Sequence, residues 1–568
     1  MSANLWNYGH LSTMINRIPG GARAIRFAAL PLVASFIAAC AGMRGPQPRT
    51  LRSHVATIVV IYAENRSFDN LFGRFPGARG IGEVLREDGK PTGAYVPQRD
   101  RDGSLLAELP RTWGGVTAAG VTPAVSESQT AGLPNAPFAI ETAFTPRSNV
   151  VLSSRVVTRD LHHRFFENQM QIAGGGNDGF AAWSDAGGLA MGHYDDGRSA
   201  LTGLAQRYVL ADEFFQGAFG GSFLNHQYLI CACAPIYPNA DTAPARPRIT
   251  ALDTDRDGRY LPRLRVDEKS PASALVGPPR YMSSSNIAPA AYFGDGMFHA
   301  INTMQPPYQP SGIAPAADDT SRAYADPMQP ATLPSQYQPT IGDQLDAKKV
   351  SWAWYSGSWR AATQDGMRAP GVPRTVIYAP GTAGGAPDFQ PHHQPFNYYA
   401  TFDPATRAAA RAEHLKDYQD LIADAAAGRL PAVAFYKPQG NLNQHPGYAS
   451  IAEGDEHLAA VVAKLQASPQ WAHMVIVITY DEFGGFWDHV APPKADLLGP
   501  GTRIPALIVS PFAKRGFVDH TRYDTGSVLR LIGRRFGLDP LPGIAARDAA
   551  LKAHGEPAMG DLTNALQF

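Results

Sequence analysis

Acidic and amide side chains follow two apolar runs that are typical of buried strands. Glu64 and Asn65 come directly after the first run, and Asp481 and Glu482 come directly after the second. In an open α/β sheet, ligands bind just beyond the carboxyl ends of the strands. Carboxylates are rarely buried unless they are paired or bind a metal, so these four side chains together would suit one divalent cation. Helix capping by each cluster alone is the alternative.

Ser222 stands where a helix is expected to begin. It follows Gly220 and Gly221 and precedes an apolar run. Two glycines let the backbone turn tightly and leave the hydroxyl beside free backbone N–H groups, an environment that favours an anion and would activate the hydroxyl. The pattern favours a nucleophile, with a simple N-capping serine as the alternative.

Four histidines lie in stretches rich in glycine or proline rather than on apolar helix faces: His163, His392, His393 and His445. Histidines in loops are more often functional than histidines in a core. Imidazolium groups can bind phosphoryl oxygens or protonate a leaving alkoxide, and they do so best at mildly acidic pH. Any one of the four taken alone could equally be an ordinary surface residue.

The elements that must position these residues alternate between strands and helices. This order predicts an α/β fold with a mostly parallel central sheet flanked by helices. Residues 301–340 carry eight prolines and predict a long loop insertion at about 235–345. We expect strands at 55–62, 208–211, 352–355, 432–436, 474–480 and 504–509, and helices at 408–430, 455–467 and 526–536.

Three blocks of the sequence resemble a known family. Residues 63–73, with the string Ala-Glu-Asn-Arg-Ser-Phe-Asp-Asn-Leu-Phe-Gly, resemble the opening signature of the bacterial phosphoesterase family, and residues 163–180 and 479–489 resemble two further blocks. That family holds phosphatidylcholine-type phospholipases C and an acid phosphatase branch, and it is similar in fold to the alkaline phosphatase superfamily. The resemblance implies an alkaline phosphatase-like fold and a single catalytic domain over residues 54–568.

The resemblance also implies a role for each matching position. Ser222 would be the nucleophile, and His489 and His392 would be weaker candidates for substrate binding. The residues implied to contact phosphate during catalysis are His163, His393 and His445. The residues implied to bind one divalent metal ion are Glu64, Asn65, Ser222, Asp481 and Glu482. Oxygen-rich ligands favour Ca, Mg or Mn, with Zn or Fe still open.

The Gly-Gly-Ser context of Ser222 favours the acid phosphatase branch, because the phospholipases C usually carry a threonine there. They also commonly carry extra C-terminal domains, whereas this sequence ends soon after the last matching blocks. The resemblance therefore implies an acid phosphatase that hydrolyses phosphate monoesters through a phosphoserine intermediate. A phospholipase C that cleaves head groups such as that of phosphatidylcholine is the alternative. A binding lipoprotein without catalysis is disfavoured, since every implied position holds a competent residue.

The first forty residues predict export. They contain no acidic residue and three arginines, and a 13-residue apolar run precedes Cys40. This pattern is typical of a signal peptide, and the run is too short for a membrane span, which needs about 20 apolar residues. Residues 37–40 resemble a bacterial lipobox, so we expect a signal segment at 1–40, an acylated Cys40 and a linker at 41–53. The expected location is the periplasm or cell envelope, with secretion after ordinary cleavage as the alternative and Met1 or Met14 as the start.

The composition excludes several classes of protein. Hydrophobic residues are 44% and charged residues 18%, which excludes wholesale disorder. Fifty basic and fifty acidic residues cancel, so a nucleic-acid partner bound through a basic face is not expected, and a membrane would be met only through the lipid anchor. Cys231 and Cys233 are expected as free buried thiols rather than a disulfide. Residues 253–258 resemble the start of a calcium loop, but Leu264 stands where glutamate is required, which favours a simple turn.

Overall fold

The computed structural model describes residues 49–568 except 196, 198 and 380–385. The expected signal segment and Cys40 lie outside the described residues. Residues Pro48–Phe568 form one compact unit. Within the described residues, no helix has both the length and the apolar character that a membrane crossing requires.

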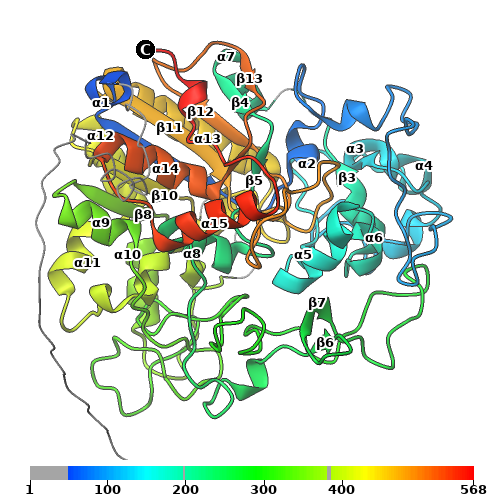
Figure 1. Cartoon of the computed structure of the whole chain (residues 1–568), viewed down its shortest axis with the longest axis horizontal. Helices are drawn as coiled ribbons and strands as arrows, with labels where there is room; N and C mark the ends of the chain where they lie inside the picture. The colour runs from blue at the N-terminus through cyan, green and yellow to red at the C-terminus, as the bar shows by residue number, and fades with distance from the viewer. Residues whose placement is uncertain (1–48, 196, 198, 380–385) are drawn as a thin grey trace, which may run out of the picture. The chain divides into compact units, whose positions relative to one another are not determined.

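An eight-stranded sheet organises this unit (Figure 1). Its strands stand in the order β13-β4-β12-β11-β1-β10-β8-β9, and only β12 runs antiparallel to its neighbours. The strands are β1 (Thr57–Ala63), β4 (Val209–Ala211), β8 (Trp352–Ser356), β9 (Leu415–Asp417), β10 (Val433–Lys437), β11 (Met474–Tyr480), β12 (Ala506–Val509) and β13 (Phe517–Asp519). The predicted α/β fold with a mostly parallel sheet is confirmed.

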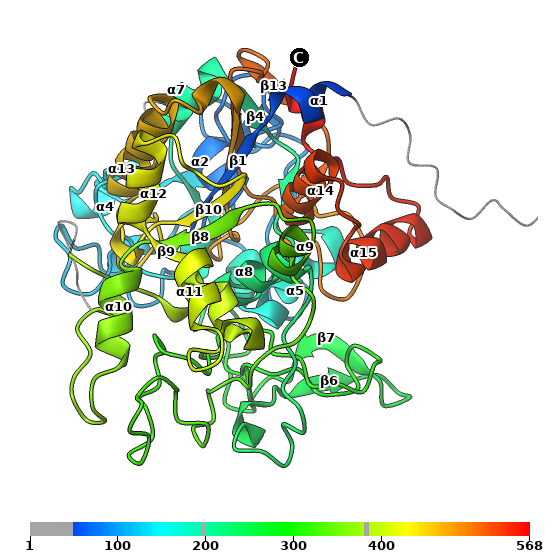
Figure 2. The same ribbon diagram turned by 90° about the vertical axis from the view of Figure 1, so that its left-hand side faces the viewer.

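Helices cover both faces of the sheet (Figure 2). One face carries α7 (Ala200–Arg207), α12 (Tyr418–Ala426) and α13 (Ile451–Gln466). The other face carries α8 (Ser222–Cys231), α9 (Ile341–Ala347) and α14 (Thr525–Phe536). Every residue of β1 and β11 is buried, which explains why these strands read as continuous apolar runs rather than alternating ones.

The remaining helices surround this three-layer core. They are α1 (Arg49–His54), α2 (Phe68–Phe72), α3 (Ile140–Ala143), α4 (Thr145–Ser148), α5 (Phe165–Ile172), α6 (Phe180–Trp183), α10 (Trp359–Gly366), α11 (Ala408–His414) and α15 (Pro542–Ala553). Residues 81–194 build a second hydrophobic cluster, which Phe483, Phe486 and Trp487 join from the loop after β11. That loop is therefore anchored in apolar packing on both sides of its polar residues.

One predicted helix, at 408–430, is wrong as a single element. The chain leaves helix α11 at His414, adds the edge strand β9 to β8, and re-enters a helix at Tyr418. The side chain of Asp417 caps α12 by accepting the N–H of Gln419 at 3.2 Å. Pairing with the sheet edge has overridden the helical propensity of this stretch.

The insertion between α8 and α9 has little regular structure (Figure 1, green). It holds the antiparallel hairpin of β6 (Leu252–Thr254) and β7 (Tyr260–Leu264). The side chain of Asp255 accepts the backbone N–H groups of Asp257 and Arg259 at 2.9 and 2.8 Å, so this motif closes a turn, as the sequence indicates.

The expectation of free thiols at the end of α8 is wrong. Cys231 and Cys233 form a disulfide. Ala232 between them has a left-handed backbone conformation, with φ of 51°, and the two Cα atoms lie 5.1 Å apart. This separation lies within the range that disulfide geometry allows.

Candidate active site

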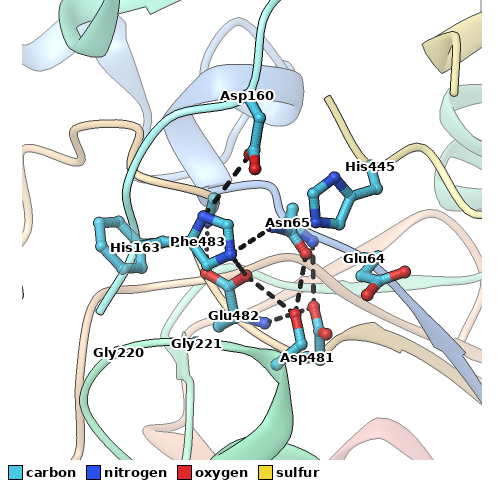
Figure 3. Close-up of polar contacts among 12 residues, drawn as sticks. Glu64, Asn65, Asp160, His163, Gly220, Gly221, His445, Asp481, Glu482 and Phe483 are labelled. Atoms are coloured by element: carbon cyan, nitrogen blue, oxygen red, sulfur yellow. Dashed lines mark hydrogen bonds and ion pairs between the residues drawn. The ribbon is translucent and has the colours of Figure 1, made fainter. Parts of the chain in front are cut away.

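The carboxyl ends of β1 and β11 meet, because the two strands are parallel neighbours with Ala63 opposite Tyr480. The N–H of Asn65 donates to Asp481 Oδ1 at 3.0 Å, and the N–H of Asp481 donates to the Ala63 carbonyl at 3.1 Å. The N–H of Arg66 donates to the carbonyl of Glu482 at 2.9 Å. Two segments more than four hundred residues apart thus form one polar cluster (Figure 3).

Ser222 is the first residue of α8, and its hydroxyl points into this cluster. Its Oγ lies 3.2 Å from Asn65 Oδ1 and 3.3 Å from Glu482 Oε1. The glycines before it are required for close packing. Gly220 has φ of +81°, and a Cβ at that position would lie 2.4 Å from the backbone nitrogen of Phe165. The double glycine therefore lets the helix start pack directly against the segment that carries His163.

Burial shifts the pKa values of the three carboxylates in different directions. Burial raises the pKa of Asp481 to about 7, and burial together with the charge of Asp481 raises that of Glu482 well above its usual range. Burial opposes ionisation of Glu64 as well, but the positive charges of His393 and Lys437 outweigh it and hold the pKa of Glu64 well below its usual range. Asp481 and Glu482 thus lack sufficient positive charge around them.

The residues present fit a bound cation. Asp481 Oδ2 is buried and has no hydrogen-bond partner, and Asp481 and Glu482 lie with Asn65 and Ser222 in one cluster of oxygen atoms. An unpartnered buried carboxylate oxygen is costly unless a cation meets it. Glu64 lies at the edge of this cluster, where its Oε1 accepts a hydrogen bond from His393 Nε2 at 2.9 Å.

His163 reaches the same cluster from the start of α5. Its Nδ1 lies 2.6 Å from the Leu161 carbonyl and donates to it, which leaves Nε2 to accept from the Asn65 amide at 3.2 Å. Nε2 also lies 3.6 Å from Glu482 Oε1. Burial lowers the pKa of His163 to about 4. The ring therefore stays neutral until acid or an added negative charge protonates it.

His445 lies beside His163. Its ring stacks on Tyr448 with centroids 4.3 Å apart, and the rings of His163 and His445 meet edge to face with centroids 5.7 Å apart (Figure 3). Burial lowers the pKa of His445 as well. These two histidines and Asp160 could together hold a metal ion, since one ligand atom of each lies within 4.8 Å of the others.

The structure reverses the order expected for His392 and His393. His393 is almost fully buried, bonds to Glu64 and does not line the cavity, and burial lowers its pKa to about 3. His392 is the one that lines the cavity, with both ring nitrogens free of hydrogen bonds. A direct contact with phosphate, which the resemblance implied for His393, therefore suits His392 better.

His489 does not lie on the cavity, so the substrate-binding role implied for it does not fit its position. Its Nδ1 donates to Asp69 Oδ2 at 2.6 Å. The buried guanidinium of Arg503 donates to Asp69 at 3.1 Å and to Asp488 at 2.9 Å. Although these acids and His489 are close enough to hold a metal ion, Arg503 already compensates their charge. The group ties the loop after β11 to α2 and β12.

A cavity of about 420 Å³ opens in front of Ser222. Three of the implied histidines, His163, His392 and His445, line it together with Ser222. The other lining residues are mostly polar and include three from the insertion, and the set contains Asp160, Arg164, Asn286, Asn302, Thr303, Tyr378, Gln390 and Tyr448. The nucleophile, the histidines and a polar wall thus face one space.

Two buried residues near the site were missed by the sequence reasoning. Lys437 lies at the end of β10, with its Nζ 3.4 Å from Glu64 Oε2. His226 lies one helical turn after Ser222, its Nδ1 donates to the Ser222 carbonyl at 2.7 Å, and its ring stacks on His393 with centroids 5.4 Å apart. The rule that found Glu64 could have found Lys437, because both follow a predicted strand directly.

Known proteins resemble parts of this chain. Phospholipase C B of Mycobacterium tuberculosis is 30% identical over 175 residues, which cover 26% of this chain and 32% of that protein. Non-hemolytic phospholipase C of Pseudomonas aeruginosa is 30% identical over 180 residues, which cover 26% of this chain and 25% of that protein. The chain thus matches about a third or less of the length of these relatives.

Among solved structures, a protein in the alkaline phosphatase superfamily from Vibrio parahaemolyticus aligns with 62% of this chain and 63% of its own, at 10% identity and a TM-score of 0.26. A likeness at that score carries no argument, and the fold assignment rests on the sheet topology above. The model of the Phosphoesterase family matches residues 55–539, which include all of the cluster around Ser222. The chain belongs to the Phosphoesterase family.

Proposed function

We propose that this chain is a metal-assisted phosphoester hydrolase of the acid phosphatase type, which cleaves phosphate monoesters with Ser222 as the nucleophile. The observation that carries the proposal is the position of Ser222 Oγ. It lies at a helix start, 3.2 Å from Asn65 and 3.3 Å from Glu482, and opens onto a cavity that three histidines line. Membership of the Phosphoesterase family supports the reaction class.

A divalent cation held by Glu64, Asn65, Ser222, Asp481 and Glu482 would neutralise the carboxylates and favour the ionised serine oxygen. The first N–H groups of α8 have no partner within the helix and face an anion placed before it. Ser222 Oγ loses its proton and attacks phosphorus in line with the leaving oxygen. The bond from phosphorus to the leaving oxygen breaks as the bond to Oγ forms.

The histidines hold the phosphoryl oxygens and supply the proton that the leaving oxygen takes up. His163 Nε2 is suited to this because its Nδ1 proton is fixed on the Leu161 carbonyl. Water then hydrolyses the phosphoserine and releases inorganic phosphate. Because burial lowers the pKa of His163 to about 4, a phosphate dianion and acidic solution both favour its protonated form, which supports an acidic optimum.

The test replaces the nucleophile. We expect Ser222→Ala to reduce hydrolysis of p-nitrophenyl phosphate by about a thousandfold or more, with an unchanged melting temperature, since Ser222 Oγ bonds only to Asn65 and Glu482. Acid-quenched wild-type enzyme should carry phosphate on Ser222. Ser104→Ala, in an exposed loop, is the control. Normal turnover by Ser222→Ala would exclude the assignment.

A second candidate function, phospholipase C, is favoured by different observations. The relatives named above are phospholipases C. The insertion that supplies part of the cavity wall also exposes large apolar side chains, with Val276 73% and Met282 60% exposed. Exposed apolar side chains beside a polar cavity suit a substrate held in a lipid surface. Faster release from phosphatidylcholine vesicles than from p-nitrophenyl phosphate would favour this function over the first.

We also propose that the protein is an exported lipoprotein of the periplasm or cell envelope, acylated on Cys40. The signal-like segment supports this, and the Cys231–Cys233 disulfide suits an oxidising compartment. We expect radiolabelled palmitate to enter the wild-type protein in a bacterial host and not the Cys40→Ser variant. Equal labelling of both would exclude acylation at Cys40, and a wholly cytosolic product would exclude export.

A further inference from the structure

The chain places a lysine behind the carboxylates of the candidate metal site. Lys437 is fully buried, and its Nζ lies 3.4 Å from Glu64 Oε2 and 3.9 Å from Asp481 Oδ2. Nζ also donates to the Ala63 carbonyl at 3.4 Å. Lys437 is not among the residues that line the cavity. Its ammonium therefore approaches the site from the side of the sheet, opposite to the side from which substrate would enter.

The charges of the site do not balance without this lysine. Glu64, Asp481 and Glu482 are all fully buried and carry three negative charges when ionised. One divalent cation supplies two positive charges, and Lys437 supplies the third. In the described part of the chain, no other lysine or arginine lies within 4.0 Å of these three carboxylates. Buried charge of one sign is strongly unfavourable, so the third charge matters for both metal and substrate.

A purely structural role does not account for the position of the ammonium. Strands β10 and β1 are already joined by a continuous parallel ladder from Ile58 to Ile61. An apolar side chain of the same length would satisfy the packing, and replacing buried ion pairs by apolar groups often preserves stability. The ammonium instead reaches two carboxylates that belong to different strands, β1 and β11.

We propose that Lys437 is an electrostatic positioning residue that acts as a fixed second cation. It makes the site neutral with a single divalent ion, so that a phosphate dianion can bind in front of that ion. This proposal rests on the proposed phosphoester chemistry at Ser222. Lys437 would act through the carboxylates and the ion, without touching substrate.

The proposal predicts effects of opposite sign on two ligands. In Lys437→Met the carboxylates keep their charge and lose a competing cation, so Mn²⁺ alone should bind about tenfold or more tightly, or bind at a second equivalent. Inorganic phosphate added to the Mn²⁺-loaded protein should bind about tenfold or more weakly, because one positive charge near it is gone. Both constants can be measured by isothermal titration calorimetry, without turnover.

The controls separate this proposal from the proposed function. Lys464→Met, on the exposed face of α13, should change neither constant. If the wild-type protein binds neither Mn²⁺ nor Ca²⁺, the proposed metal-assisted function fails. If the wild type binds the ion and Lys437→Met weakens both ligands together or leaves both unchanged, only the role of Lys437 is overturned.

A second variant covers the case in which Lys437→Met does not fold. In Glu64→Gln/Lys437→Met the lost positive charge is matched by a lost negative charge, so the buried site regains its balance. Recovery of a cooperative thermal transition in the double variant would support the charge-balancing role. A double variant that also fails to fold would show that Lys437 is required for packing and would overturn the proposal.

Discussion

At the scale of single residues, Asp481 divides its two oxygens between the backbone and the site. Oδ1 accepts the N–H groups of Asn65 and Glu482 at 3.0 and 2.8 Å, whereas Oδ2 has no hydrogen-bond partner. Asp481→Asn keeps the acceptor at Oδ1 and removes the charge at Oδ2. We expect this variant to fold and to lose about tenfold or more in affinity for divalent metal, measured by elemental analysis after dialysis.

Asp488→Asn is the matched control for that loss, because Asp488 is equally buried but bonds to Arg503. It should lower the free energy of unfolding and leave the metal content unchanged. A metal content that stays constant in Asp481→Asn would remove Asp481 from the proposed ligand set.

His489 allows a test of stability against pH that does not involve the metal site. Burial lowers its pKa, but the charge of Asp69 outweighs burial and raises the pKa of His489 above 6.5, while the same pair lowers the pKa of Asp69. The stabilisation is therefore full below about pH 6.5 and disappears as pH rises through the raised pKa of His489. It also disappears in strong acid, as pH falls through the lowered pKa of Asp69.

We expect His489→Gln to lower the free energy of unfolding by about 1–3 kcal/mol near pH 5.5, and by much less near pH 9. Urea unfolding of both proteins at the two pH values measures the difference. His554→Gln, in an exposed stretch after α15, should show no such dependence. A loss that grows toward alkaline pH would contradict the assigned ion pair.

At the scale of elements, the start of α8 depends on glycine for a steric reason. A Cβ at Gly220 would lie 2.4 Å from the Phe165 nitrogen, and φ there is +81°. Gly220→Ala should push the helix start away from α5 and displace Ser222 from Asn65. Because displacements of about 1 Å can reduce turnover a hundredfold, we expect at least a tenfold loss in kcat on p-nitrophenyl phosphate.

Gly258→Ala is the matched control for this variant. Gly258 has φ of +79° in the β6–β7 turn, and an added Cβ would meet nothing within 4 Å. It should therefore carry a similar backbone strain, of about 1 kcal/mol, with unchanged kcat. If both variants keep full turnover, the close packing at Gly220 does not position the nucleophile.

The sequence predicted the central elements because their patterns are local. Buried parallel strands are continuous apolar runs, and the rule that ligands gather at strand ends located Glu64 and Asp481 before their contact was known. The edge strand β9 was missed because its residues favour a helix and only pairing with β8 makes them a strand. Local pattern carries no information about such a partner.

The order of His392 and His393 could not be predicted for a similar reason. The two residues are adjacent in sequence, and their directions are set by distant contacts. The His393 carbonyl accepts the indole N–H of Trp354 at 2.8 Å, and its ring bonds to Glu64. With His393 fixed inward, His392 faces the cavity. Only the assembled sheet, with Trp354 on β8 and Glu64 after β1, determines which histidine meets substrate.

At the scale of the whole molecule, the cavity is built from segments that are far apart in sequence. The insertion contributes Asn286, Asn302 and Thr303 to the wall, and Asn302 accepts the N–H of Phe165 at 3.1 Å beneath His163. The sequence indicated a long loop here but not that the loop closes one side of the site. The insertion is thus part of the substrate-facing surface, and its exposed apolar residues bear on which ester the protein hydrolyses.

This arrangement yields a test that separates the two candidate substrates at the level of the whole protein. Met282 lies two residues before Ser284, whose carbonyl accepts from the cavity residue Arg164 at 2.7 Å, and Val276 lies in the same loop. If phospholipids in a bilayer are the substrate, Val276→Ser/Met282→Ser should reduce hydrolysis of phosphatidylcholine vesicles about tenfold or more, because each buried apolar side chain contributes about 1.5–3 kcal/mol. Hydrolysis of soluble p-nitrophenyl phosphate should not change.

The matched control moves the same chemistry elsewhere. Leu105 and Val151 are 60% and 61% exposed and lie outside the insertion, so Leu105→Ser/Val151→Ser should leave both rates unchanged. A selective loss on vesicles in the insertion variant would favour the phospholipase. Equal rates for the insertion variant, the control and the wild type on vesicles, together with faster hydrolysis of the soluble monoester, would favour the phosphatase. The exposed apolar side chains of the insertion would then have no part in substrate choice, and the cavity wall alone would set it.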